Sequence, residues 1–152
     1  MATIETKLAG IFLNADDLWN DGAQGLNASL SQFTEHCTKD FKCRVIGQEF
    51  QLAGEGVGLD NAKAFFTQRV VPTFLNALDI NAPKEREVTL IANGGPGEWS
   101  VVEIKGKGTS KKGQPWVQEA AVLLKSNDEG KWTEIKFYMD TLHIQNHILQ
   151  SS

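Results

Sequence analysis

Several residue types are scarce in this chain of 152 residues, which has 2 cysteines, 4 prolines and 1 tyrosine. Two thiols in a chain without a visible export signal favour free, reduced cysteines over a disulfide. The N-terminus reads Met-Ala-Thr-Ile-Glu-Thr-Lys, which places an acid early and lacks the apolar segment of a secretory signal. The sequence therefore predicts a cytoplasmic protein.

Long apolar runs and an excess of basic residues are also lacking. Apolar runs such as Ala120–Leu124 are far shorter than the roughly 20 residues of a membrane span. The formal net charge is −4, whereas a protein that binds nucleic acid without regard to sequence needs a basic face. Because 41% of the residues are hydrophobic and 22% are charged, the chain can bury a core. We expect one soluble domain over residues 1–152, with neither a membrane nor a nucleic-acid partner.

Helical periodicity dominates the first half of the chain. Apolar residues recur at helical spacing over Leu8–Trp19, Leu26–Lys39 and Asp60–Val71. We expect Asp60 to cap the third of these helices, and Pro72 to kink or end it because proline lacks a backbone donor.

Between the second and third helices the pattern is shorter and less regular. Phe41–Ile46 alternates like a short strand, and Gln48–Ala53 is a second candidate strand. The glycine-rich stretch Gly54–Gly58 is best interpreted as a flexible loop, because no parallel strand follows to complete a nucleotide-binding unit.

From Glu85 onward the period changes to that of strands. Four runs rich in Val, Ile, Leu, Thr and aromatics predict strands over Glu87–Asn93, Trp99–Lys107, Pro115–Lys125 and Lys131–Met139. Short turns that contain glycine separate them, which favours antiparallel neighbours, and Thr141–Leu149 is expected to be helical. Helices followed by such strands predict an α+β fold. A curved sheet around the helices would leave a cone with an apolar pocket at its open end.

This order of elements resembles that of the SnoaL-like polyketide cyclases of the nuclear-transport-factor-2-like superfamily. The motifs that carry the resemblance are Gly58–Phe66 (GLDNAKAFF), Gly106–Thr109 (GKGT), Gly113–Trp116 (GQPW) and Gly130–Thr141 (GKWTEIKFYMDT). The resemblance implies a cone-shaped, strongly curved antiparallel sheet wrapped around N-terminal helices. It also implies chemistry without a cofactor, although the superfamily includes non-catalytic domains as well.

The resemblance implies that Asp140 is the catalytic residue. In SnoaL-like cyclases an aspartate at the end of the last strand is the general acid/base, and Asp140 occupies that position. The alternative is that Asp140 caps the helix that opens at Thr141, and the two roles are compatible. His143, three residues on, is a candidate proton-transfer partner. His143 and His147 share a helical face, but without a glutamate base or a clear third ligand we predict no metal site.

Arg44 is the third candidate catalytic residue, because it interrupts the apolar run Phe41–Ile46. A guanidinium that points into the cone could hold an enolate or carboxylate oxygen. The equally open alternative is an arginine exposed on the strand.

Candidate pocket walls are aromatic side chains and one amide, because aromatic rings stack on planar ligands and an amide orients them. They are Trp116, Gln118, Tyr138, Trp99 and Phe66. Each of them is also a plausible core residue. Tyr138 is the only tyrosine, which disfavours a dehydratase site that needs paired tyrosines.

These features together predict a cofactor-independent cyclase or isomerase of secondary metabolism. Its substrate would be a hydrophobic, carbonyl-containing polyketide or terpenoid intermediate. The alternative is a non-catalytic small-molecule-binding or adaptor domain of the same fold. Surplus apolar strand positions also predict a homodimer through the outer face of the sheet. They are Val101, Ile104, Val117, Ala121, Leu123, Ile135 and Phe137.

Overall fold

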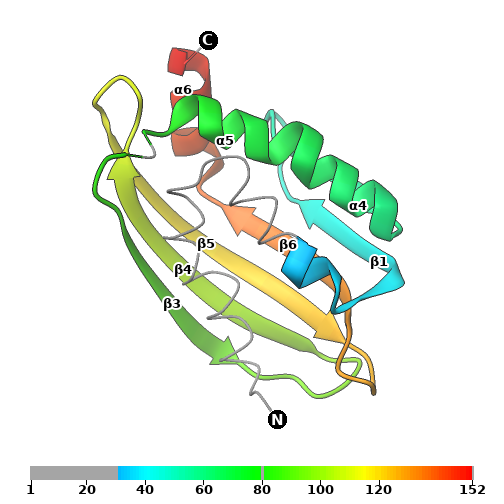
Figure 1. Ribbon diagram of the computed structural model, residues 1–152. Coiled ribbons are helices and arrows are strands. Elements are labelled where there is room, and N and C mark those ends of the chain that lie inside the picture. Colours follow the sequence, from blue (N-terminus) through cyan, green and yellow to red (C-terminus); the bar gives the residue numbers. More distant parts are fainter. Residues whose placement is uncertain (1–30, 80, 152) are drawn as a thin grey trace.

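The computed structural model describes residues 31–79 and 81–151 (Figure 1). The elements are β1 (Cys37–Val45), β2 (Gly54–Val57), α4 (Leu59–Phe65), η1 (Phe66–Val70), α5 (Val71–Ala77), β3 (Glu85–Ala92), β4 (Trp99–Thr109), β5 (Pro115–Ser126), β6 (Trp132–Met139) and α6 (Thr141–Ser151). The helix expected over Leu8–Trp19 lies outside the described residues, as do residues 26–30 of the next one. None of the described helices has the length and apolar character that a membrane span requires.

Six strands form one curled, open sheet in the order β2-β1-β6-β5-β4-β3. The four strands from Glu85 onward form the predicted antiparallel meander, and each begins and ends within two residues of its expected bounds. The sheet is nevertheless mixed, because β1 pairs with β6 in parallel. The expectation of a wholly antiparallel sheet is therefore wrong at this pair. A parallel pair needs a long connection, and here the helices and four strands (β2, β3, β4 and β5) supply it.

The helix expected over Leu26–Lys39 is wrong at its C-terminal end. Helical residues reach Thr34, and β1 already begins at Cys37. The backbone N–H of Trp132 donates to the carbonyl of His36 at 2.8 Å, so the turn before β1 is tied to the start of β6. Pairing with β6 overrides the helical spacing of the apolar residues in this segment.

The glycine-rich stretch expected to be a loop contains an edge strand instead. Gly54–Val57 forms β2, antiparallel to β1, whereas Gln48–Ala53 makes turns and not the expected strand. The free edge of β1 supplies hydrogen-bond partners that compensate for the weak strand propensity of glycine.

One helical segment runs from Leu59 to Ala77 through η1, alongside β1 and β2 (Figure 1). The residue before it is Gly58, and Asp60 lies in the first turn, so the predicted Asp60 cap is wrong. Pro72 does not end the helix. The N–H of Val71 donates to the carbonyl of Phe66, five residues back, in the π-helical turn just before the proline. This wider turn relieves the clash between the proline ring and the preceding carbonyls.

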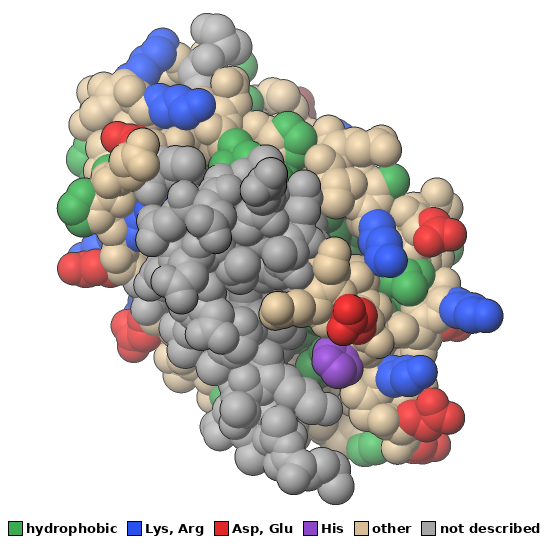
Figure 2. Space-filling model, in the orientation of Figure 1, with side chains coloured by type: hydrophobic (Ala, Val, Ile, Leu, Met, Phe, Trp, Pro, Cys, Tyr) green, Lys and Arg blue, Asp and Glu red, His purple; other side chains and the backbone are tan. Residues whose placement is uncertain are grey.

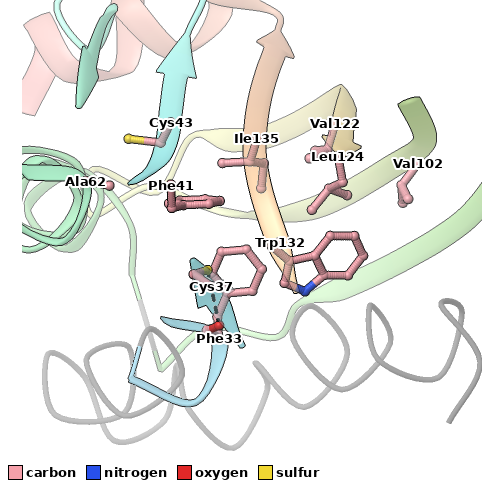
Figure 3. Close-up of a cluster of buried hydrophobic side chains, with 10 residues drawn as sticks. All are labelled: Phe33, Cys37, Phe41, Cys43, Ala62, Val102, Val122, Leu124, Trp132 and Ile135. Carbon is pink, nitrogen blue, oxygen red and sulfur yellow. Dashed lines mark hydrogen bonds between the residues drawn. The ribbon is translucent and has the colours of Figure 1, made fainter. Parts of the chain in front are cut away.

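Alternate residues of the strands build the core on one side of the sheet, which we call the inner face. A first cluster joins β1, β4, β5 and β6 to Phe33 and Ala62 (Figure 3). Its buried members are Phe33, Cys37, Phe41, Cys43, Ala62, Val102, Val122, Leu124, Trp132 and Ile135. A second cluster joins the sheet to α5 and α6, and includes Val45, Leu52, Ala77, Trp116, Ile144 and Ile148.

The opposite side of the sheet, the outer face, has fewer apolar residues than the sequence predicted. Ile104, Ile135 and Phe137 belong to the inner face, because they pack in or against the first cluster. Their assignment to a surplus on the outer face is therefore wrong. Strand alternation leaves the outer face with Val101, Val117, Ala121 and Leu123.

Candidate functional site

Three phenylalanine rings converge on the inner face and link the two core clusters. The Phe65 and Phe66 rings meet edge to face at a centroid distance of 5.7 Å, and the Phe66 and Phe137 rings do so at 5.8 Å. Phe65 and Phe137 pack against both clusters. All three rings are only partly buried, so part of this aromatic surface stays accessible. The role of Phe66 as a pocket wall stays a prediction.

Gln118 brings an amide to the same face of the sheet. It lies between the buried Trp116 and Ala120 on alternate positions of β5, and it is partly buried. Its Nε2 donates to the sulfur of Met139 at 3.9 Å, which is a weak acceptor. The amide is therefore available to exchange this contact for a stronger one with a ligand.

Glycine stands opposite Gln118 on the neighbouring strand. Gly106 of β4 pairs with Gln118, and Gly108 pairs with Trp116. Among the described residues, the nearest atom to a Cβ placed on Gly106 would be the Glu85 carbonyl oxygen at 3.9 Å. The inner face therefore carries no side chain of β4 beside the Gln118 amide.

The inner-face positions of β4, β5 and β6 are all apolar or uncharged. They are Ser100, Val102, Ile104, Gly106, Gly108, Trp116, Gln118, Ala120, Val122, Leu124, Ile135, Phe137 and Met139. In the view of Figure 2, charged side chains of both signs are scattered over the visible surface. These three strands thus offer a ligand apolar contacts and, at Gln118, one amide.

Trp116 is a core residue and not the expected pocket wall. Only 4% of its surface is exposed. Its ring lies 5.8 Å from that of Phe74, 5.9 Å from that of His143 and 4.8 Å from that of His147. These contacts leave little of the indole to face a ligand.

The imidazole of His143 hydrogen-bonds to β5 rather than to Asp140. Its Nε2 accepts a hydrogen bond from the Val117 N–H at 3.0 Å, so the neutral ring carries its proton on Nδ1. What links His143 to Asp140 is the backbone N–H, which donates to Asp140 Oδ1 at 3.2 Å. Among the described residues, no group of three potential ligands completes a metal site around His143 and His147.

Asp140 caps α6. It follows the last residue of β6, its side chain is exposed, and its Oδ1 accepts the His143 N–H while its carbonyl accepts the Ile144 N–H at 3.2 Å. The capping role, left open by the sequence, is confirmed. The role of Asp140 in proton transfer stays a prediction.

Three predicted site residues lie on the outer face. Arg44 is exposed between the buried Cys43 and Val45, so it does not point into the cone. Tyr138 pairs with Ala121 and is 43% exposed. The Trp99 ring lies under the ammonium groups of two lysines, Lys125 at 4.5 Å and Lys136 at 4.9 Å. Strand alternation sends all three side chains away from the inner face, and the expectation that they line the pocket is wrong.

The two cysteines are buried and reduced. Burial raises the pKa of the Cys37 thiol to about 12 and that of Cys43 to about 11. Both thiols therefore stay protonated near neutral pH and are poor nucleophiles.

Several inner-face residues were missed by the sequence reasoning. Phe65, Phe137 and Met139 line the same surface as Phe66 and Gln118. The alternation Ile135–Phe137–Met139 in the last strand is the signal that could have found two of them, since Ile135 is clearly a core residue.

No family model and no curated protein sequence matches the chain. Solved structures do. A candidate isomerase from Bacillus subtilis has 12% sequence identity and a TM-score of 0.63, with 95% of this chain and 91% of that one covered. A candidate SnoaL-like polyketide cyclase from Jannaschia sp. CCS1 has 19% identity and a TM-score of 0.57, with 97% and 95% covered. TerC, co-crystallised with polyporic acid, has 20% identity and a TM-score of 0.59, with 96% and 97% covered.

These likenesses establish the fold. Proteins described as NTF2-like and as having a ketosteroid-isomerase-like fold share it too. The α+β fold of the SnoaL-like and NTF2-like proteins, inferred from the sequence, is confirmed.

Proposed function

We propose that the protein is a cofactor-independent cyclase or isomerase of secondary metabolism that acts in the cytoplasm on a hydrophobic, carbonyl-containing polyketide or terpenoid intermediate. The observation that carries this proposal is the accessible aromatic surface of Phe65, Phe66 and Phe137 on the same face as the Gln118 amide. Structural neighbours that are described as cyclases and isomerases support it.

Each part of the site has a distinct task in this reaction. The phenylalanine rings and the bare strand at Gly106 accept the flat, apolar body of the substrate. The Gln118 amide donates to a substrate carbonyl, which orients it and stabilises the enolate that forms when a proton leaves the adjacent carbon. Asp140, directly after Met139 in the chain, is the proposed acid/base. Arg44 has no task here, because it lies on the outer face.

Ligand binding tests the inner-face site directly. Polyporic acid, the molecule crystallised with TerC, is a suitable first probe, measured by isothermal titration. Gly106→Val should weaken binding by at least about tenfold, since its side chain would occupy the space beside Gln118. The φ angle of Gly106 is not positive, so valine suits this strand position. Thr89→Val, at an exposed outer position of β3, is the matched control and should leave binding unchanged.

Turnover on a substrate separates catalysis from binding alone. Asp140→Asn keeps the size and the capping oxygen but removes the base, and should lower turnover about 10²–10⁴-fold. Near-normal turnover in this variant would remove Asp140 from the mechanism. Binding at the inner face without turnover in the wild-type protein would favour the alternative, a non-catalytic binding domain. The observation that favours this alternative is that Asp140 is exposed and caps α6.

We also propose a homodimer through the outer face. Val101, Ala121 and Leu123 lie side by side there, next to Tyr138. Charged residues of both signs surround this group: Lys125 pairs with Glu134, and Lys105 lies between Glu87 and Glu119. A two-fold axis through the apolar group would bury it between two copies of the chain. Sedimentation should show a dimer that Leu123→Glu dissociates. A wild-type monomer at about 10–100 μM would overturn this proposal.

A further inference from the structure

α6 closes an edge of the sheet that β6 leaves open. The last residue of β6, Met139, pairs with Ala120, so no β6 residue stands opposite Val117. The Val117 N–H is bound instead by Nε2 of His143, at 3.0 Å. A histidine side chain from α6 thus replaces a strand as the partner of this backbone group.

A second histidine lies directly beside the first. The His147 ring is 4.6 Å from that of His143 and 4.8 Å from that of Trp116, and it is buried, with 6% of the residue exposed. The helix positions next to these histidines, Ile144 and Ile148, are buried in the second core cluster. The interface between α6 and β5, which we call the seam, therefore contains two titratable groups, His143 and His147.

The charged groups around this seam lie at its margins. α5 (Val71–Ala77), the helix packed against α6, contains no ionisable side chain. On the sheet, Glu119 and Lys107 are exposed on the outer face near Val117. Asp140 accepts the backbone N–H of His143. Arg69 donates to the carbonyl of Gln51 at 2.6 Å, and the N–H of Gln51 donates to Gln145 of α6 at 2.8 Å.

We propose that His143 and His147 form a pH-sensitive latch that holds α6 on β5 at neutral pH and releases it in mild acid. A protonated imidazole has no acceptor nitrogen, so protonation of His143 breaks its bond with Val117. Two imidazolium rings at the observed separation of 4.6 Å also repel each other. Release of α6 would uncover Trp116 and the adjacent end of the inner face.

The direction of the pH effect follows from linkage. Burial, together with the neighbouring His143, lowers the pKa of His147 from its ordinary value of 6.5. The released state therefore binds more protons than the docked state. The packing of α6 on β5 is most favourable above about pH 6.5, and its free energy becomes less favourable as the pH falls below that value. Each histidine that takes up a proton on release raises the open population about tenfold per pH unit.

Amide exchange of the whole protein, resolved by residue and corrected for the intrinsic pH dependence of exchange, tests the latch. Between about pH 7.5 and about pH 5.5, protection of α6 and of the Val117 amide should fall at least tenfold, whereas the buried β4–β5 amides keep theirs. His143→Gln retains an acceptor that does not titrate, and should reduce the pH dependence. His147→Phe, which keeps a ring against Trp116, should reduce it as well.

His36→Gln is the matched control, because His36 is exposed in the turn before β1 and is the only other histidine. It should leave the pH dependence of α6 unchanged. Equal protection of α6 at both pH values in the wild-type protein would overturn the proposal. So would loss of the pH dependence in the His36→Gln variant, or its full retention in both His143→Gln and His147→Phe.

Discussion

Gly56 of β2 and Ala62 of α4 lie so close together that a Cβ atom on Gly56 would be 2.7 Å from the Cα of Ala62. Backbone atoms form the whole contact, including the Asn61 carbonyl oxygen at 2.8 Å, so no side chain can rotate away. Gly56 is thus the residue that lets the edge strand pack against the helix. The glycine-rich composition that resembles a flexible loop is a packing requirement.

Gly56→Ala should therefore destabilise the protein by about 2–3 kcal/mol, because the strand and the helix must separate to accept the methyl group. Urea unfolding monitored by circular dichroism measures this change. Gly95→Ala is the matched control. The atom nearest to its Cβ among the described residues is Glu98 Oε2 at 3.8 Å, so its effect should stay within about 0.5 kcal/mol. Equal stability of the two variants would contradict the close approach.

Asp140 should contribute to stability through its cap, whatever its catalytic role. Asp140→Ala removes the acceptor of the His143 N–H and should cost about 1 kcal/mol. Asp140→Asn keeps an acceptor oxygen and should lower the free energy of unfolding by only roughly a few tenths of a kcal/mol. Thermal unfolding of the two variants side by side measures the difference, and a larger loss in the asparagine variant would argue against capping.

The thiols of Cys37 and Cys43 should be unreactive in the folded protein. Both are buried, and their raised pKa values, about 12 and about 11, leave almost no thiolate at neutral pH. A colorimetric disulfide reagent at about pH 8 should label neither cysteine in native buffer and both in concentrated guanidinium chloride. Rapid labelling of either thiol in native buffer would show that the first core cluster opens readily.

The antiparallel meander was predictable because its alternation and its turns are local signals. Alternation is regular along β4 and β5, and along β6 from Glu134 to Met139, and turns with positive-φ glycines at Gly97, Gly113 and Gly130 separate the four strands from β3 to β6. Each element could therefore be placed within two residues. The fold class followed from the order of these elements.

The face to which each side chain points was less predictable. Trp99, Tyr138 and Arg44 suit a ligand site by residue type, but the pairing register puts them on the outer face. A shift of one residue in register would reverse this, and register depends on contacts between strands far apart in the sequence. β2 was missed for a related reason, since four residues rich in glycine form a strand only where β1 offers an edge.

Arg44 and Gln118 provide the sharpest comparison between the inner face and the outer face. Both are polar residues on strands whose inner-face positions are largely apolar. Gln118 lies on the inner face, whereas Arg44 lies on the outer face. Gln118→Leu removes the amide, keeps the approximate volume and should weaken binding of a carbonyl-containing ligand by about 1–2 kcal/mol, the worth of one hydrogen bond at an otherwise apolar site. Arg44→Leu should leave binding and turnover unchanged, because its side chain is separated from the inner face by the sheet itself.

Isothermal titration with the same ligand, for both variants and the wild-type protein, makes the comparison. Circular dichroism should confirm that both variants fold. A loss of binding in Arg44→Leu that equals the loss in Gln118→Leu would mean that the ligand does not occupy the inner face. In that case the outer face, where Trp99 lies under Lys125 and Lys136, would become the site to examine.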